Sequence, residues 1–253
     1  MILKTEQLSF YYGNQQVLHG IDFQIEPGIT AIIGPNAVGK STLMKCLCGI
    51  LRGQGNVRLD GKLINAWTHE EISRRVSYLP QAFTTRAVLT VFETVLLGRL
   101  GHLGWHVSDE DIQIVDRLLE AMQLSELGQR WLNQLSGGQA QRVAIAQALA
   151  RQPNVLLMDE PTSSLDLRQQ VDVLTFIKKW TLENRIATVI AIHDLNLAAQ
   201  FADNVCMLAN GRVFGQGAPR ELLTPEAIAS VYGVTAHIVH ENDRLFVHVL
   251  GSL

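Results

Sequence analysis

Residues 34–42 read GPNAVGKST and contain the pattern G-x-x-x-x-G-K-[ST] between Gly34 and Ser41. The apolar stretch ITAII (29–33) precedes this loop, and a helix is expected to follow from Gly39 to about Leu51. Backbone N–H groups of such a loop and the helix N-terminus behind it can cradle phosphates. The alternative is an ordinary glycine-rich turn, but the strand and helix on either side favour nucleotide binding.

The loop residues predict how the phosphates would be held. Lys40 adds a positive charge for the β- and γ-phosphates, and the Ser41 hydroxyl completes a Mg²⁺ shell. Ala37 lies where such loops often carry glycine, and a positive φ there costs alanine about 1 kcal/mol. We therefore expect mild strain with retained ATP binding. The expected nucleotide-binding residues of this stretch are Gly34, Pro35, Asn36, Ala37, Val38, Gly39, Lys40, Ser41 and Thr42.

The composition is that of a globular protein. Apolar residues make up 47% of the 253 residues and charged residues 18%, so a sizeable core is expected rather than disorder. The net charge of −3 comes without a block of Lys or Arg, which argues against a nucleic-acid partner. Three scattered cysteines predict buried thiols in a reducing compartment. The first residues read as a strand rather than a signal peptide, and no apolar run reaches the roughly 18 residues of a membrane span, which predicts a cytoplasmic protein.

Strands and helices alternate over much of the chain. Apolar runs such as VLLM (155–158) and ATVIAI (187–192) alternate with helical patterns, which indicates a parallel sheet covered on both faces. Strands are expected at residues 2–10, 20–26, 29–33, 55–64, 76–79, 155–159, 187–192 and 204–208. Further helices are expected at 167–183 and 195–201, with a short one after the capping box at 68–71.

The stretch 82–134 has a helical pattern instead. The sequences TVFE (90–93) and SDED (108–111) look like helix starts. An amphipathic helix is predicted by the spacing of Ile112, Val115, Leu118, Leu119 and Met122. We interpret this stretch as a helical insertion in an α/β domain.

Two further stretches carry candidate chemistry for hydrolysis. The apolar strand at 155–158 leads into Asp159 and Glu160. Such a pair suits Mg-nucleotide hydrolysis, with Asp159 orienting the metal through its waters and Glu160 polarising the attacking water; taken alone, it is as consistent with a helix cap. The stretch LSGGQ (135–139) opens a helix, where two glycines admit an anion and Ser136 can donate its hydroxyl, or where it forms only a flexible N-cap.

Together these stretches resemble the ATP-binding subunits of ABC transporters over nearly the whole chain. The matching segments, in family order, are the Walker A loop 34–42, Gln81 in SYLPQ, the signature LSGGQ 135–139, the Walker B strand VLLMDE 155–160, SSLD 163–166 and His193 in AIHDL. The resemblance implies one α/β domain over residues 1–253, a P-loop NTPase core with a parallel sheet. It further implies an N-terminal antiparallel β subdomain, a helical subdomain at about 82–153 and a C-terminal extension with a hairpin at about 218–253.

The resemblance also implies residue roles. Tyr12 would stack on adenine, although it is also consistent with an ordinary strand aromatic. Gln81 would sense Mg²⁺ and the attacking water, so that the expected metal-site residues are Ser41, Gln81 and Asp159. His193 would contact the γ-phosphate and hold Glu160, which makes the expected catalytic residues Glu160, His193 and Gln81.

The assembly is likewise implied by the family. Two copies would face head to tail, with each ATP between the Lys40 loop of one copy and Ser136, Gly137, Gly138 and Gln139 of the other. Asp166 would lie across the same interface. Because the chain has one intact version of each half-site, a symmetric homodimer is expected. The further partners would be an integral-membrane permease dimer and a periplasmic or surface substrate-binding protein acting through it, with the chain peripheral at the cytoplasmic face of the inner membrane.

Two regions are similar to the importer subfamily that serves ferric siderophores, haem and cobalamin. They are LTVFETVLLGRLGH (89–102) and the segment 193–234, which contains HDLNLAA and LLTPEAIASVYGV. Importers of another metal or oxyanion ligand are the nearest alternatives. Apolar residues near 82–106 are expected either to face the permease or to form the core of the helical lobe: Phe83, Val88, Phe92, Leu100, Leu103 and Trp105.

Two other functions compete with transport. One is a soluble ABC-type ATPase that acts as a clamp, but the chain has no coiled-coil insertion and no second cassette. The other is a regulator without turnover, which the presence of Glu160, Gln81 and His193 disfavours. A metal site at His237, His240 and His248 was weighed against a β-hairpin with its turn at 241–244, and the hairpin is favoured.

Overall fold

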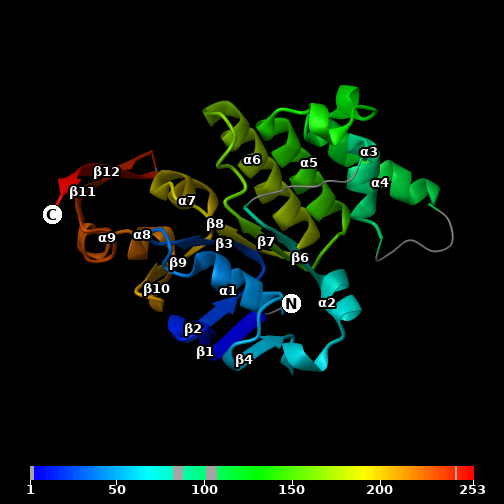
Figure 1. Cartoon of the computed structure of the whole chain (residues 1–253). Helices are drawn as coiled ribbons and strands as arrows, with labels where there is room; N and C mark the ends of the chain where they lie inside the picture. The colour runs from blue at the N-terminus through cyan, green and yellow to red at the C-terminus, as the bar shows by residue number, and fades with distance from the viewer. Residues whose placement is uncertain (1–2, 82–87, 101–106, 243) are drawn as a thin grey trace.

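The computed structural model describes residues 3–81, 88–100, 107–242 and 244–253 (Figure 1). Its strands are β1 (Leu3–Tyr12), β2 (Gln15–Ile25), β3 (Gly28–Ile33), β4 (Gln54–Leu59), β5 (Lys62–Leu63), β6 (Val76–Leu79), β7 (Val155–Asp159), β8 (Ala187–Ala191), β9 (Asn204–Ala209), β10 (Arg212–Gly217), β11 (Val234–Glu241) and β12 (Arg244–Ser252). Its helices are α1 (Lys40–Leu47), α2 (His69–Arg75), α3 (Val91–Leu97), α4 (Asp109–Ala121), α5 (Gly137–Ala150), α6 (Leu167–Asn184), α7 (Leu195–Phe201), α8 (Pro219–Leu222) and α9 (Pro225–Tyr232).

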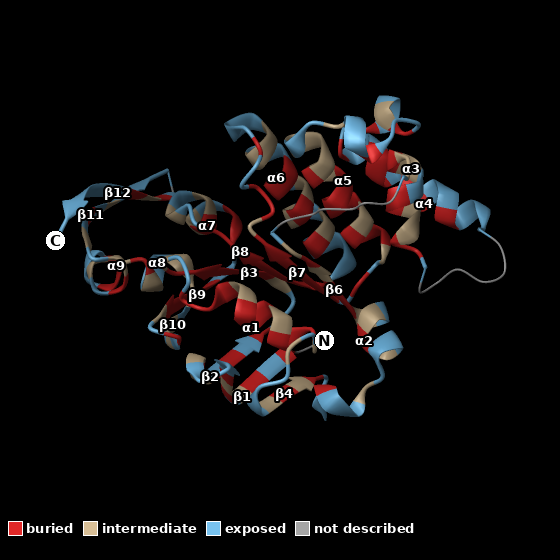
Figure 2. Ribbon diagram, in the orientation of Figure 1, coloured by how far each residue is buried: buried red, intermediate tan, exposed pale blue. Residues whose placement is uncertain are grey.

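A six-stranded sheet in the order β10-β9-β3-β8-β7-β6 forms the centre of the molecule. Its strands from β9 to β6 are parallel, and β10 is antiparallel to β9 at the edge. Every residue of β7 and β8 is buried, as Figure 2 shows in red, because helices cover both faces. Helix α1 lies on one face, and α5, α6 and α7 lie on the other (Figure 1). The predicted parallel sheet is confirmed.

Alternate residues of one central strand enter different cores. Leu156 and Met158 of β7 join a core with residues of α5, α6 and α7. Leu157, between them, joins a second core with residues of α1 and the first two strands. This division follows from the two-residue side-chain period of a strand.

A four-stranded antiparallel sheet in the order β2-β1-β4-β5 confirms the predicted N-terminal β subdomain. Its strand bounds differ from the prediction, since one expected strand at 55–64 is divided into β4 and β5. Asp60 and Gly61 have φ values of 51° and 77°, so the chain turns there. The strand expected from residue 20 begins at Gln15, because the turn at Gly13, with φ 58°, already reverses the chain.

The helical lobe is held by capping boxes and one buried ion pair. Thr90 caps α3 and Ser108 caps α4, each with its own side chain and a carboxylate three residues later, as predicted. Arg99 Nε donates to Asp111 Oδ1 at 2.8 Å, and Arg99 Nη1 donates to the Ala150 carbonyl at 2.9 Å. Arg99, two residues after α3, thereby joins the first turn of α4 to the C-terminal end of α5.

The predicted amphipathic stripe in α4 was wrong at one position, Ile112. Ile112 is 38% exposed, whereas Ile114 is 2% exposed and packs in the core. The buried set, which includes Val115 and Leu118, follows the 3.6-residue period, and position 112 falls on the solvent side of that stripe.

At the C-terminal end, β11 and β12 form an antiparallel hairpin in which Glu241 lies opposite Arg244. His237 lies opposite His248, and both are exposed. Among the described residues, no three His, Cys, Asp or Glu side chains are grouped in a way that could hold a metal ion. The division into a helical subdomain at 82–153 and an extension at 218–253 stays a prediction.

The three cysteines are free and buried, as the sequence predicted. Burial raises the pKa of the Cys206 thiol to about 12 and that of Cys48 to about 11, so both are protonated at neutral pH. Within the described ranges, no helix is both long enough and apolar enough to span a bilayer.

Candidate nucleotide-binding site

The loop between β3 and α1 requires glycine at two positions. Gly34 has φ 147°, and a Cβ there would lie 2.5 Å from the Leu208 carbonyl oxygen. Gly39 caps α1 with φ 109°, and its Cβ would lie 2.8 Å from Leu18 Cδ2. Ala37 has φ 61°, the left-handed region in which an L-residue is strained. The positive φ on which the strain hypothesis depends is therefore present, and its effect on ATP affinity stays a prediction.

Lys40 is buried within its own loop. Its side chain is 5% exposed, and Nζ donates to the carbonyl oxygens of Gly34 at 2.7 Å and Pro35 at 2.9 Å. Burial lowers the pKa of Lys40, while the nearby charges of Glu160 and Asp159 raise it. The ammonium group is thus held by backbone oxygens in front of two carboxylates.

Asp159 ends β7 and has one carboxylate oxygen without a partner. The Tyr78 hydroxyl donates to Asp159 Oδ2 at 3.4 Å, whereas the buried Oδ1 has no hydrogen-bond partner among the described residues. Tyr78 itself is half-buried, and burial followed by the charge of Asp159 raises its pKa, so it remains a hydroxyl donor. A carboxylate oxygen such as Asp159 Oδ1 and a hydroxyl such as that of Ser41 are the kinds of oxygen ligand that Mg²⁺ prefers.

Both carboxylate oxygens of Glu160 are occupied. Gln81 Nε2 donates to Glu160 Oε2 at 2.7 Å, and His193 Nε2 contacts Oε1. Gln81 follows β6, Glu160 follows β7 and His193 follows β8, which are neighbours in the sheet. Because the carboxyl ends of parallel strands meet at one edge, three residues distant in sequence converge there. The predicted contact of His193 with Glu160 is present, while the direct bond from Gln81 was not predicted.

A cavity of about 490 Å³ connects these groups. It is lined by Tyr12, Gln15, Val17, Asn36, Ala37, Gly39, Lys40, Ser41, Thr42, Gln81, Glu160 and His193. Tyr12 ends β1, is 50% exposed and meets Phe10 edge to face at 4.9 Å between ring centroids. The sequence did not single out Gln15 and Val17, although their place just after Tyr12 in the same hairpin was an available signal.

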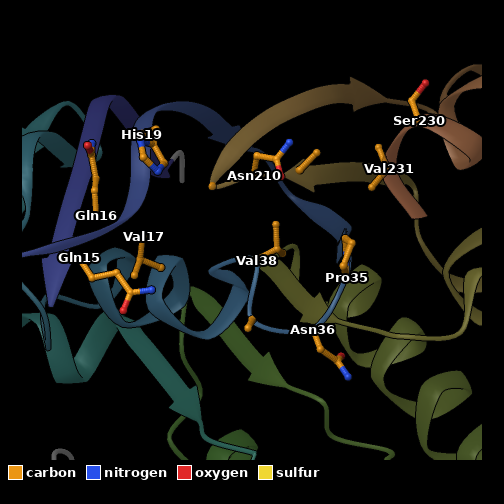
Figure 3. A pocket seen from close by; sticks show the side chains of 13 residues that line it. Gln15, Gln16, Val17, His19, Pro35, Asn36, Val38, Asn210, Ser230 and Val231 are labelled. Carbon is orange, nitrogen blue, oxygen red and sulfur yellow. The ribbon is translucent and has the colours of Figure 1, made fainter. Parts of the chain in front are cut away.

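A second cavity, of about 470 Å³ (Figure 3), shares the lining residues Gln15, Val17, Asn36 and Ala37 with the first. Pro35 and Val38, which the sequence placed at the nucleotide, line this second cavity instead. Asn210 from the β9–β10 turn and Ser230 from α9 form its far wall. Residues of the loop at 34–42 therefore line two neighbouring cavities.

The signature residues lie apart from the nucleotide cavity. Ser136 caps α5: its Oγ accepts from Gln139 N at 3.3 Å, and its own N donates to Gln139 Oε1 at 2.9 Å. Ser136 and Gly137 are exposed, and none of the residues 136–139 lines the cavity. Asp166 is exposed and caps α6 through a bond from Gln169 N to Oδ1 at 2.8 Å. One copy of the chain thus does not bring these residues to its own Lys40 loop.

The fold and the site define a class of protein. A glycine-bounded loop between a central strand and a helix, with carboxylates at the end of a neighbouring parallel strand, is the arrangement of a P-loop nucleotide hydrolase. Residues 18–163, more than half of the chain, match the family model described as ABC transporter. The chain belongs to this family, and it is an ATP-binding ABC ATPase in which hydrolysis is coupled to transport.

Curated relatives match nearly the full length. An uncharacterized ABC transporter ATP-binding protein of Methanocaldococcus jannaschii is 41% identical over 96% of this chain and 95% of its own length. The ferric enterobactin transport ATP-binding protein FepC of Escherichia coli is 36% identical, with 94% and 90% covered. The hemin import ATP-binding protein HmuV of Pseudomonas entomophila is 38% identical, with 96% and 97% covered.

Solved structures of cassettes have the same fold. An inward-facing transporter assigned to the metal-chelate type matches with a TM-score of 0.82 and 28% identity, covering 99% of this chain and 97% of the other. The dimeric, post-hydrolysis state of an ATP-binding cassette bound to ADP and Pi matches with a TM-score of 0.78 and 28% identity, covering 86% and 99%. ATPases of this family use ATP, generally with Mg²⁺, and act as dimers with membrane permeases.

Proposed function

We propose that this chain powers a membrane importer whose cargo is a ferric siderophore, haem or cobalamin. The observation that carries the ATPase mechanism is the position of Glu160, held by Gln81 and His193 opposite the Lys40 loop. The cargo class is supported by the similarity to FepC and HmuV, whose names state ferric enterobactin and hemin transport. An importer of another metal or oxyanion ligand is the alternative within the same plan.

Hydrolysis would proceed through the residues at the strand ends. Lys40 and the loop N–H groups would bind the phosphates, and Tyr12 would stack on adenine at the mouth of the cavity. Glu160 would accept a proton from the attacking water, and His193 and Gln81 would keep its carboxylate in place. Ser41, Asp159 and Gln81 would hold Mg²⁺, which supplies charge stabilisation at the phosphates when bound.

The signature segment supports a homodimer. Ser136 and Gly137 are exposed and Gly137 has open space around it, so a phosphate of another copy could approach them. Gly138 is closer to its own chain, where a Cβ would lie 3.4 Å from the Ser164 carbonyl oxygen. Two ATP sites would then form between two copies, each using the Lys40 loop of one copy and residues 136–139 and Asp166 of the other.

The permease would dock on the helical lobe. Val88 and Leu100 are 75% and 59% exposed at the two ends of the α3 segment, which favours contact with a partner. Phe92 packs against the lobe core, which favours a structural role. The other three candidates, Phe83, Leu103 and Trp105, lie outside the described residues. A substrate-binding protein would act through the permease, and the chain would be peripheral at the cytoplasmic face of the inner membrane.

Co-purification with a permease tests this function. The tagged chain is extracted from detergent-solubilised membranes, and ATPase activity of the recovered complex is measured with a binding protein loaded with ferric siderophore, haem, cobalamin or molybdate. We expect an integral-membrane partner and stimulation by one of the first three cargoes. Stimulation by molybdate alone would move the assignment to oxyanion import. Recovery only from the soluble fraction, with no membrane partner, would favour the clamp.

A further inference from the structure

A third cavity, of about 460 Å³, lies between the core and the C-terminal hairpin. It is formed by parts of α6, α7, α8 and β12, and α7 lies between α6 and β12 in Figure 1. None of its described lining residues also lines the nucleotide cavity. Its size is within the range of small-molecule sites, roughly 300–1,000 Å³.

Three cationic side chains from three different elements line this cavity. They are Lys178 of α6, Arg220 of α8 and Arg244 of β12. No described carboxylate is among the lining residues, although the chain as a whole carries a net charge of −3. Cations gathered in a hollow with apolar walls raise the local concentration of anions. The cavity is therefore suited to a negatively charged ligand.

Two of these cations make no ion pair in the part of the chain that the structure describes, although Glu241 lies opposite Arg244 in the hairpin. Neither the Lys178 ammonium nor the Arg244 guanidinium makes an ion pair or side-chain hydrogen bond there. The adjacent Lys179, by contrast, lies 3.8 Å from Glu183 on the exposed side of α6. Lys178 is half-buried and Arg244 is exposed, and both line the hollow. A ligand with two negative groups could bridge α6 and β12.

The floor of the cavity is apolar. Phe201 and Leu245 are 5% and 6% exposed, and Phe246 is half-buried beside them. A simple inorganic ion would leave this surface uncovered, whereas a ring or short hydrocarbon would cover it. The complementary ligand is thus an organic dianion with one apolar face.

The cavity is connected to the nucleotide site through α7. Asn196, in the first turn of α7, donates to the Val247 carbonyl at 3.2 Å and accepts from Val247 N at 2.7 Å. Val247 follows the lining residues of β12 directly, and α7 begins two residues after His193. A ligand that fixes β12 against α6 would therefore restrict the position of α7, the helix that follows His193.

We propose that this cavity binds an organic dianion with an apolar face, and that its occupancy is linked to nucleotide binding through α7. The binding part is independent of the function proposed above, because it uses none of the nucleotide-site residues. The linkage part rests on the ATPase assignment.

Calorimetric titration of the nucleotide-free protein with isophthalate and with succinate tests the binding part. Isophthalate should bind about tenfold tighter than succinate because its ring covers the apolar floor. The double variant Lys178→Met, Arg244→Gln should lose about tenfold or more in affinity for isophthalate, since two charge-assisted contacts are removed. The matched control is Lys179→Met, Arg168→Gln, which removes two exposed cations outside the cavity and should bind as the parent does.

Several outcomes would overturn the site. These are no measurable isophthalate binding, equal affinity for the two acids, or an equal loss in the control variant, which would indicate general charge attraction. Far-ultraviolet circular dichroism and retained ADP binding verify that the double variant is folded. For the linkage, the affinity for isophthalate is compared with and without ATP in the Glu160→Gln protein. A change of about threefold or more is expected, and an unchanged affinity would remove the linkage while leaving the site.

Discussion

The Lys40 loop and the signature segment, both assigned to ATP, are built in different ways. Around the loop, side chains already hold one another: the buried Lys40 is bonded to its own loop carbonyls, and Glu160 is held between the exposed side chains of Gln81 and His193. In the signature segment, Ser136 and Gly137 are exposed, and Ser136 is bonded only within its own helix cap, to Gln139. One region is arranged within a single chain, and the other is left open.

This difference indicates that the two regions contribute to different steps, the loop to nucleotide binding and the signature segment to turnover in the dimer. A pre-formed phosphate cradle and catalytic carboxylate let one copy bind nucleotide, since little rearrangement of the loop is needed. An open signature cap contributes nothing to that binding in the same copy, and would act only when a second copy closes over it. Substitutions in the two regions should therefore affect binding and turnover differently.

The largest expected effect comes from Glu160→Gln. The amide cannot accept a proton from water, so hydrolysis should fall about a hundredfold or more while ATP stays bound. Phosphate release and retention of labelled ATP measure the two effects. Glu120→Gln, on the exposed side of α4, is the matched control and should leave turnover unchanged. Normal turnover in Glu160→Gln would show that another residue is the base.

Gly137→Ala separates the two regions most directly. Apart from its two neighbours and the backbone of its own helix, no described atom of the same chain lies within 4 Å of a Cβ at Gly137, so folding should be unaffected, within about 0.5 kcal/mol. In a closed dimer the added methyl group would meet the other copy's nucleotide, and turnover should fall about tenfold or more with ATP affinity of the single copy unchanged. Gly251→Ala, equally open and far from the signature, is the control. Full activity in Gly137→Ala would contradict a phosphate contact there.

Arg99→Met tests how much the ion pair of Arg99 stabilises α5, the helix that begins at the signature, at its C-terminal end. The change leaves the Asp111 carboxylate buried without its cation and frees the Ala150 carbonyl, so the free energy of unfolding should fall by about 3 kcal/mol. Arg74→Met breaks a pair that is 52% and 72% exposed, and should cost about 0.5 kcal/mol or less. Urea denaturation compares the variants. An equal loss of unfolding free energy in both variants would show that the buried Arg99 pair stabilises the fold no more than an exposed pair does.

The same ion pair predicts a pH dependence. The Ser108 hydroxyl and Arg99 lower the pKa of Asp111 from 3.8 to about 2. Because the folded-state pKa is the lower one, the stabilisation is fully present above the unfolded value of 3.8 and is lost as pH falls toward 2. Asp111→Asn should therefore flatten the stability curve between pH 4 and 2, measured by urea denaturation across that range. An unchanged slope would assign acid unfolding to other carboxylates.

Ala37→Gly should have the smallest effect. Relief of the positive φ at this position should leave ATP affinity equal or up to about fivefold tighter. Equilibrium binding of ATP to the nucleotide-free chain measures the change. A tenfold loss would refute the strain account.

Much of the site was predictable because its residues follow short patterns. The loop at 34–42 and the carboxylates after β7 were located from neighbouring strand and helix signals, and both lie at the expected ends of the sheet. The bond from Gln81 to Glu160 was not predicted, since it depends on the distance between two strand ends 79 residues apart. Ile112 was misplaced because an apolar residue beside a stripe looks like part of it. Pro35 and Val38 were assigned to the nucleotide from their motif; they line a different hollow, and their contact with the nucleotide stays a prediction.

The order of strands, loops and caps was fixed by the sequence itself, because backbone preferences and hydrophobic periods act over a few residues. It sufficed to establish an α/β cassette with a phosphate cradle and to indicate which residues carry charge. Only the tertiary structure decided which charged groups lack an ion-pair or hydrogen-bond partner among the described residues, as at Asp159 Oδ1 and at Lys178 and Arg244. It also decided that the signature lies apart from its own loop, since such relations depend on how distant elements pack in space.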